Sequence, residues 1–235
     1  MTNRKDAPLR ATRQGLLGFA ASALIASGAY AQESNAPTLV LEGVTVVDTR
    51  DGQVTPGQSL VIVGDRIERI VPAGTADADG AEIVDASGKF VVPGYLDMHS
   101  HALTSGNAAS NLALLLAHGV TGFRQMSGAD PLLARRKQVP SLTPPGMPDV
   151  LMMPGDLVTG ASVRTPEDAA SFVARQKELG ADFIKVLDTN AAAYMALLEE
   201  AAKAGIPVAG HLPPSVSLEA AIGTGIHAIE HLGPR

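Results

Sequence analysis

From Gly94 onward, strand-like and helix-like segments alternate along the chain. Short apolar runs predict strands at 95–99, 120–126, 149–153, 182–187, 206–211 and 226–231. Between them the pattern predicts helices at 107–118, 131–137, 166–179, 190–204 and 215–223. Such alternation favours a parallel sheet with crossover helices, because two parallel strands cannot be joined by a tight turn.

The spacing of these strands distinguishes two parallel folds. Intervals of about 20–35 residues are typical of the βα units of a barrel. An open doubly wound sheet would be favoured by a GxGxxG loop between a strand and a helix, and the sequence has none in that place. The predicted fold class is therefore α/β: an incomplete (β/α)8 TIM-type barrel over 94–235, with six strands where the barrel has eight. Open edges favour pairing with another chain, so a homo-oligomer is one interpretation and a piece of a longer enzyme is the other.

The helix predicted over 166–179 has the clearest boundaries. Thr165 suits the capping position, Pro166 fits the first turn, and Asp168 is the third helical residue. Gly180 and Gly205 stand where two of the predicted helices should end, since glycine readily adopts the left-handed conformation.

The segment before the barrel, 37–93, is all-β. Residues 38–48 predict a strand pair or one bent strand, rich in Val, Leu and Thr. A hairpin turn at Gly64-Asp65 separates two further strands, and Ser87-Gly88 separates two more; these lie at 59–63, 67–71, 82–85 and 89–92. Pro93-Gly94 then interrupts the chain, which marks the boundary of a small separate segment.

The first 31 residues have the layout of a secretory signal peptide. Four basic residues precede an uncharged apolar run from Gly15 to Ala29, and Ala29-Tyr30-Ala31 offers small residues at the positions of a cleavage site. The alternative is a membrane anchor, but 15 residues fall short of the roughly 20 that span a bilayer. We expect cleavage near Ala31, a secreted or periplasmic product, and no stable membrane anchor.

Composition excludes several classes of function. The net charge of -6 argues against nucleic-acid partners, which bind basic surfaces, and 3% aromatic residues offer few stacking platforms. There are no cysteines, so disulfides, thiolate metal sites and cysteine nucleophiles are excluded. Any metal must be held by nitrogen and oxygen ligands.

Four of the six histidines lie at the carboxyl ends of predicted strands. His99 and His101 are two positions apart, so both imidazoles should face the same side of one strand. His211 and His231 end the fifth and sixth predicted strands. Because active sites of barrels lie at this rim, the four side chains predict a metal site; a chance HxH pair is the simpler interpretation of the first two alone. Asp97 shares their face and could orient a ligand.

Three further residues have simpler interpretations. His118 precedes Gly119 at a helix end, where a cation suits the helix dipole. His227 is expected to be a core residue or a support for a ligand. Lys185 interrupts an apolar strand and should have a partner or an altered charge; taken alone, it is more simply a salt-bridged lysine.

Four motifs in this order resemble the amidohydrolase superfamily, in its imidazolonepropionase-like and prolidase-like branch. VVPGYLDMHSH, which ends at His101, is similar to the first barrel strand, and ADFIKV is similar to the fourth-strand segment that bears a carboxylated lysine. AGHLP and AIEHLG are similar to the fifth- and sixth-strand histidine motifs. The resemblance runs from about residue 38 to the end and implies that 37–93 belongs to a small β-sandwich beside the barrel.

The resemblance implies the roles of five residues. His99 and His101 would bind one divalent metal ion, expected to be zinc, and His211 and His231 would bind a second. Lys185, carboxylated by CO2, would be a catalytic residue and the anionic bridge between the ions. Manganese, iron or cobalt would also suit such ligands.

These roles imply a metal-dependent hydrolase that cleaves C–N bonds of a small molecule: an amide, a cyclic amide or a dipeptide. A metal-activated water would attack the carbonyl, and the leaving nitrogen would be protonated. The alternative is a catalytically inactive, secreted metal-binding remnant, because no Asp here matches the eighth-strand aspartate of the superfamily. Gln125 also stands where relatives often have Asp in the second strand.

Overall fold

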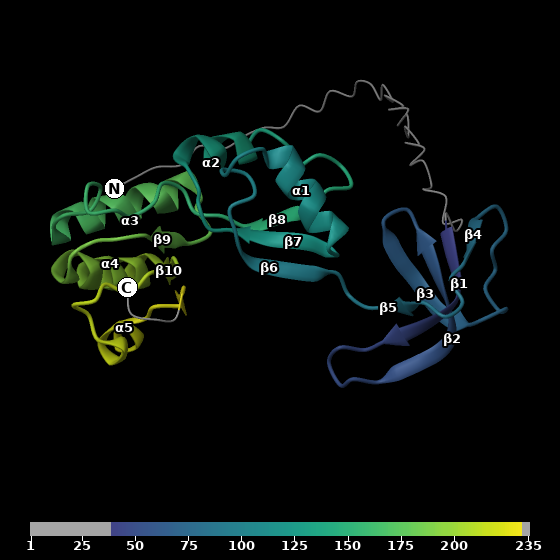
Figure 1. Cartoon of the computed structure of the whole chain (residues 1–235). Coiled ribbons are helices and arrows are strands. Elements are labelled where there is room, and N and C mark those ends of the chain that lie inside the picture. The colour runs from purple at the N-terminus through teal and green to yellow at the C-terminus, as the bar shows by residue number, and fades with distance from the viewer. Residues whose placement is uncertain (1–38, 232–235) are drawn as a thin grey trace, which may run out of the picture. The chain divides into compact units, whose positions relative to one another are not determined.

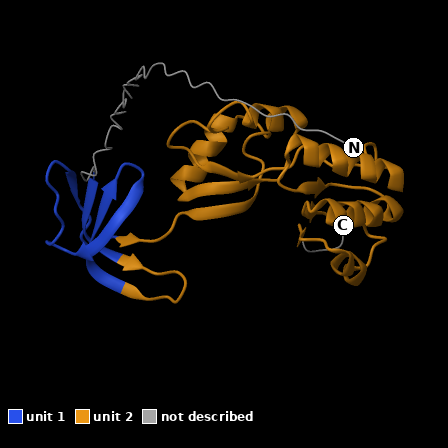
Figure 2. Ribbon diagram, turned by 180° about the vertical axis from the view of Figure 1, so that it is seen from behind, with its two compact units in different colours: residues 1–45, 55–89 blue, residues 46–54, 90–235 orange. Residues whose placement is uncertain are grey.

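The computed structural model describes residues 39–231, so the predicted signal peptide, 1–31, lies outside the described residues. The chain divides into two compact units: residues up to 45 together with 55–89, and residues 46–54 together with 90–235 (Figure 2). In the part of the chain that is described, no helix combines the length and apolar character needed to cross a bilayer.

One small sheet contains the first five strands (Figure 1). These are β1 (Leu39–Val47), β2 (Val54–Val63), β3 (Arg66–Pro72), β4 (Glu82–Asp85) and β5 (Phe90–Val91). Their order is β3-β2-β1-β4, with β5 paired to β1. The predicted hairpin is confirmed: β2 and β3 are antiparallel, and Gly64 between them has φ 59°. Residues 39–47 form a single strand, and the second sheet of a sandwich stays a prediction.

The predicted alternation of strands and helices after Gly94 is confirmed (Figure 1). The strands are β6 (Tyr95–Ser100), β7 (Val120–Gln125), β8 (Asp149–Met152), β9 (Ile184–Val186), β10 (Val208–Gly210) and β11 (Ala228–Ile229). The helices are α1 (Ala108–Ala117), α2 (Asp130–Arg136), α3 (Pro166–Leu179), α4 (Ala191–Ala204) and α5 (Leu218–Thr224). The last three strands are shorter than predicted: the first two residues of each predicted strand, and one or two at its end, lie outside the strand.

All six strands pair in parallel, in two groups of three. The groups have the orders β6-β7-β8 and β11-β10-β9, so neighbours in the sequence are neighbours in space. A parallel bridge between Val158 and Val186 connects the segment after β8 to β9. Neither group contains the reversal of strand order that defines a doubly wound sheet.

Capping determines where the longer helices begin and end. The hydroxyl of Thr165 accepts from the Asp168 amide, and the Asp168 carboxylate accepts from the Thr165 amide, which is the predicted capping box of α3. Gly180 and Gly205 close α3 and α4 at φ 80° and 64°, a left-handed conformation that a side chain would strain.

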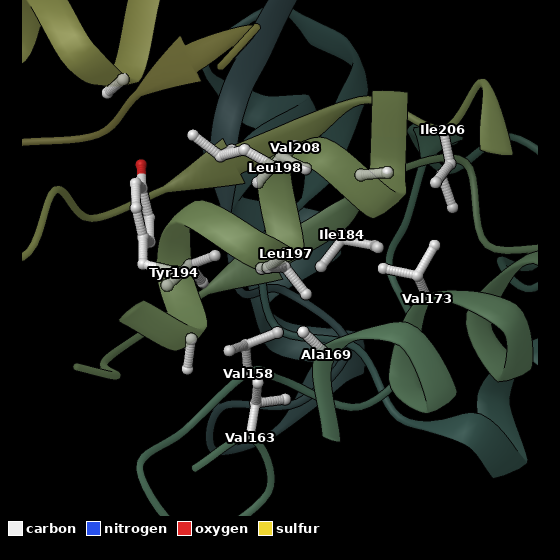
Figure 3. Close-up of a cluster of buried hydrophobic side chains, with 14 of the residues drawn as sticks. Val158, Val163, Ala169, Val173, Ile184, Tyr194, Leu197, Leu198, Ile206 and Val208 are labelled. Carbon is white, nitrogen blue, oxygen red and sulfur yellow. The ribbon is translucent and has the colours of Figure 1, made fainter. Parts of the chain in front are cut away.

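The main core lies between the β9–β10 strands and helices α3, α4 and α5 (Figure 3). Ile184 and Val208 contribute the strand side, and Val173 and Leu197 contribute the helix side. Tyr194 is also completely buried here. This packing holds the carboxyl ends of β9 and β10 in fixed register, which positions the residues that follow them.

Candidate metal centre

The five predicted site residues gather around one cavity of about 220 Å³. His99 lies in β6 and His101 directly follows it, Lys185 is the middle residue of β9, and His211 and His231 follow β10 and β11. Met126, Leu157 and Leu187 complete the lining. The strand register causes this convergence: Ala209 pairs with Lys185, and the His211 amide donates to the Val186 carbonyl at 3.0 Å.

The four imidazoles form a continuous series. Ring centroids of His101 and His99 are 5.4 Å apart, those of His99 and His231 are 4.5 Å apart, and those of His231 and His211 are 5.3 Å apart. The Nε2 atoms of His99 and His101 are separated by 3.4 Å. Two nitrogens bound to one tetrahedral zinc ion at about 2.0–2.1 Å would stand about 3.4 Å apart. The HxH pair therefore fits one metal ion.

Hydrogen bonds at Nδ1 fix the tautomers of two histidines. His99 Nδ1 lies 2.6 Å from Glu230 Oε2, and His211 Nδ1 lies 2.8 Å from the carbonyl oxygen of Leu187. Since a carboxylate and a carbonyl accept hydrogen bonds, both Nδ1 atoms carry protons. With Nδ1 protonated, Nε2 is the nitrogen of each ring that can bind a metal ion, which is the arrangement of metal-bound histidines in proteins.

Burial and the neighbouring side chains favour the neutral form of His101. Burial lowers the pKa of His101 below its ordinary value, and electrostatic interaction with His99, Lys185 and His231 lowers it further. Lys185 itself is only 2% exposed. A neutral imidazole is the form that coordinates metal. An ammonium this close to a cation would be repelled, whereas a carboxylated lysine would be anionic.

Glu230 and Arg124 also belong to this site, although the sequence did not single them out. The Glu230 side chain is 10% exposed and the Arg124 side chain 14%. Glu230 Oε1 accepts from Arg124 Nη2, and Arg124 Nε donates to the Met98 carbonyl at 2.7 Å. Burial tends to raise the pKa of Glu230, but the His99 hydrogen bond and the charge of Arg124 lower it overall. One signal in the sequence could have found them: Arg124 and Glu230 are each the only side chain of their charge type, Arg/Lys or Asp/Glu, in a predicted strand that is otherwise largely apolar.

The remaining sequence candidates have structural roles. Asp97 accepts from the His99 amide at 2.9 Å, so it supports the backbone of His99 rather than its ring. His118 caps α1 as expected, with Nδ1 2.9 Å from the Leu114 carbonyl. The prediction for His227 is wrong: its ring is exposed and lies 3.0 Å from the Gly225 carbonyl, because β11 begins only at Ala228.

Gln125 holds the loop that follows β6. Its side chain is completely buried. Its Nε2 donates to Thr104 and to the Ser127 carbonyl, and its Oε1 accepts from the Leu103 amide. A neutral amide that both donates and accepts therefore satisfies this network.

The centre is not fully arranged for ligation. Among His, Cys, Asp and Glu side chains of residues 39–231, no group of three already forms a metal-binding set. The His99–His101 pair comes nearest to the geometry of two ligands on one metal ion. The ring of His231 contacts that of His99, and the ring of His211 contacts that of His231. The donor chemistry and the spacing of the His99–His101 pair fit a metal ion.

Known proteins similar to this chain are consistent with this geometry. No family profile matches the chain. An adenine deaminase from Chelativorans sp. (strain BNC1) is 27% identical over 195 residues, which cover 75% of this chain and 32% of the relative. This chain thus spans about a third of the length of the curated relatives that match most of it.

Two solved structures share the fold. A bottromycin amidohydrolase is 27% identical with a TM-score of 0.58, over 80% of this chain and 42% of that chain. A prolidase complexed with N-methylphosphonate-L-proline is 24% identical with a TM-score of 0.60, over 82% of this chain and 60% of that chain. Together with the histidine and lysine motifs that meet at one cavity, these similarities support membership of the amidohydrolase superfamily.

Proposed function

We propose that this chain carries the metal-binding part of a hydrolase that cleaves C–N bonds in small molecules. The convergence of four imidazoles and Lys185 on one cavity is the observation that carries the proposal. The printed names of its relatives, an adenine deaminase, an amidohydrolase and a prolidase, all describe reactions at C–N bonds. That similarity favours a hydrolase over an inactive metal-binding remnant.

The residues would hold two divalent ions, with zinc expected. His99 and His101 would hold one, and His211 and His231 the other. Lys185, carboxylated, would bridge them as an anion. When bound, divalent ions acidify a water molecule and polarise the bond that it attacks. The Glu230 and Leu187 acceptors would keep His99 and His211 in the tautomer that ligation needs.

We further propose that the six parallel strands are the first six of a (β/α)8 barrel, with a small β-sandwich segment before them. The sequential strand order and the parallel pairing support a barrel. The histidines at the carboxyl ends of the strands would then lie at the catalytic rim. Substrates of the amide, cyclic amide or dipeptide class would enter from that side.

Export is a separate proposal that rests on the sequence alone. We propose that residues 1–31 direct the chain to the periplasm or outside the cell and are removed near Ala31. Determining the N-terminal sequence of secreted protein tests this directly. A mature chain that begins near Gln32 supports it, and a chain that retains the leader contradicts it.

The decisive experiment for the metal centre is the metal content per purified chain. The wild type is compared with a double variant, His99→Ala with His101→Ala. His118→Ala with His227→Ala is the matched control, because both of those rings are exposed and lie on other elements. We expect about two divalent metal ions per chain, with zinc the expected metal, in the wild type and in the control. Folded wild-type protein that binds no metal would contradict the proposal.

A further inference from the structure

Glu230 and Arg124 form a charged pair beside the proposed metal ligands. They come from distant parts of the chain: Arg124 lies in β7, and Glu230 directly follows β11. One carboxylate oxygen of Glu230 contacts His99, and the other contacts Arg124. We propose that Glu230 is a positioning residue for His99 and that Arg124 positions Glu230. This inference rests on the proposed metal centre.

The placement of Arg124 supports a positioning role. Its Nε donates to the carbonyl of Met98, the residue before His99, while its Nη2 donates to Glu230. Its guanidinium also lies 5.7 Å from the centroid of the Phe183 ring. One rigid, planar group therefore fixes both the backbone that carries His99 and the carboxylate that binds its ring. A lysine could not make these contacts in one geometry.

The charge of the pair determines which proton the His99 ring carries. A buried carboxylate beside a guanidinium stays ionised, so it can only accept a hydrogen bond. His99 Nδ1 must then donate, and its Nε2 lone pair points toward His101 Nε2, 3.4 Å away. Without the carboxylate, the proton could move to Nε2, which would remove a ligand atom from the centre.

Stability alone does not account for the pair. Replacing a buried ion pair by apolar side chains is often neutral or stabilising, so such a pair is weak support for a stability role. Glu230 and His99 are 131 positions apart, and Glu230 and Arg124 are 106 positions apart. The pair connects β6, β7 and the end of β11 at the cavity, where the relative position of ligands matters most for metal affinity.

The test measures zinc affinity and the His99 tautomer separately. Glu230→Gln preserves size but can donate as well as accept. We expect the zinc dissociation constant, measured by competition with a chromophoric chelator, to rise about 10- to 100-fold. In metal-free protein, nitrogen NMR of the imidazoles should show His99 protonated at Nδ1 in the wild type and a mixture of tautomers in the variant. Glu219→Gln, the same substitution at an exposed position of α5, is the control and should change neither.

A second variant separates positioning from folding. Glu230→Asp keeps the charge but is too short to reach His99 and Arg124 together, so it should also weaken zinc binding while circular dichroism stays unchanged. Arg124→Met should weaken binding too, and combining it with Glu230→Gln should cost less than the sum of the two single losses, because both side chains position the same His99.

The outcomes separate this inference from the proposed function. A wild-type protein that binds no zinc overturns the metal centre, and the tautomer measurement on metal-free protein still decides the role of Glu230. A folded Glu230→Gln variant with wild-type zinc affinity and an unchanged His99 tautomer would overturn the positioning role. A loss of zinc affinity in the Glu219→Gln control as large as that in Glu230→Gln would also overturn the positioning role.

Discussion

The carboxylates of Asp130 and Asp156 each accept a hydrogen bond from the backbone amide of the other residue. The Asp156 amide donates to Asp130 Oδ1 at 3.0 Å, and the Asp130 amide donates to Asp156 Oδ1 at 3.1 Å. Asp130 Oδ1 also accepts from Gln176 Nε2 at 3.0 Å, and its second oxygen forms an ion pair with Arg175. This carboxylate therefore joins the start of α2, the loop after β8, and α3.

We expect Asp130→Ala to lower the free energy of unfolding by about 3 kcal/mol. The substitution removes the acceptor of several donors that are buried or partly buried, and each loses a partner that water cannot easily replace. Urea denaturation measures the change. Asp156→Ala should cost only about 1 kcal/mol, because the Asp156 side chain is 47% exposed and water can replace its bond. Equal costs for the two variants would show that Asp130 is not the centre of this network.

Gly210 should tolerate no side chain. It has φ 144°, and an added Cβ would lie 2.2 Å from the Val186 carbonyl oxygen and 2.7 Å from the Val186 nitrogen. These are backbone atoms of the neighbouring strand, so β10 would have to move away from β9. We expect Gly210→Ala to lower the free energy of unfolding by about 3 kcal/mol or more. It should also reduce zinc binding, because His211 is the next residue.

Gly223 provides the matched control. It lies within α5, and an added Cβ would meet nothing within 4 Å. Gly223→Ala should therefore raise the free energy of unfolding by up to about 1 kcal/mol, since alanine favours a helix over glycine. Thermal denaturation of both variants checks the contrast. A Gly210→Ala protein as stable as the wild type would mean that β9 and β10 can separate without cost.

Local signals in the sequence predicted most of the fold. The capping residue Thr165 and the stop at Gly180 predicted α3 residue by residue. The same signals could not predict long-range contacts. Glu230 meets His99 across 131 positions, and Asp130 meets Gln176 across 46. No residue pattern near any of these four specifies its partner, because the pairing depends on how the strands and helices pack.

The histidines show the same limit. His99 and His101 were predicted to face one side because a strand alternates its side chains, and their Nε2 atoms do lie together. His227 was predicted to be a core residue or a support for a ligand within the last predicted strand, but β11 contains only Ala228 and Ile229. Outside the strand the alternation no longer applies, so the ring of His227 lies in solvent.

Tyr194 should titrate at unusually high pH. Figure 3 shows its side chain in the core cluster. Burial raises the pKa of Tyr194 from 10.0 to about 12, and its hydroxyl has no hydrogen-bond partner among residues 39–231. Between pH 10 and 12 the unfolded chain loses this proton while the folded chain keeps it. The free energy of unfolding should therefore fall as pH rises through that window, by roughly 2–3 kcal/mol. Ultraviolet titration of tyrosinate measures this pKa, by comparison with a Tyr194→Phe variant.

Tyr194→Phe is the complementary variant. It removes a buried hydroxyl that lacks a partner, so the free energy of unfolding at neutral pH should stay constant or rise by about 1 kcal/mol. The loss of stability between pH 10 and 12 should become smaller. A large loss of stability at neutral pH would show that the hydroxyl has a partner in solution, such as a bound water molecule.

Lys185 should carry a carbamate when the centre is loaded with zinc. The residue is 2% exposed and lines the same cavity as the four histidines, where an anion would balance two cations. Protein loaded in ¹³C-labelled bicarbonate should show a bound carbamate signal in ¹³C NMR that disappears when a chelator removes the metal. Lys185→Met, similar in length but without the amine, should lack the signal and bind less zinc. Lys203→Met, a substitution on the exposed face of α4, should keep the carbamate signal and bind as much zinc as the wild type. Full zinc occupancy without a carbamate signal would show that another group balances the charge of the ions, and Lys185 would then be a buried structural cation.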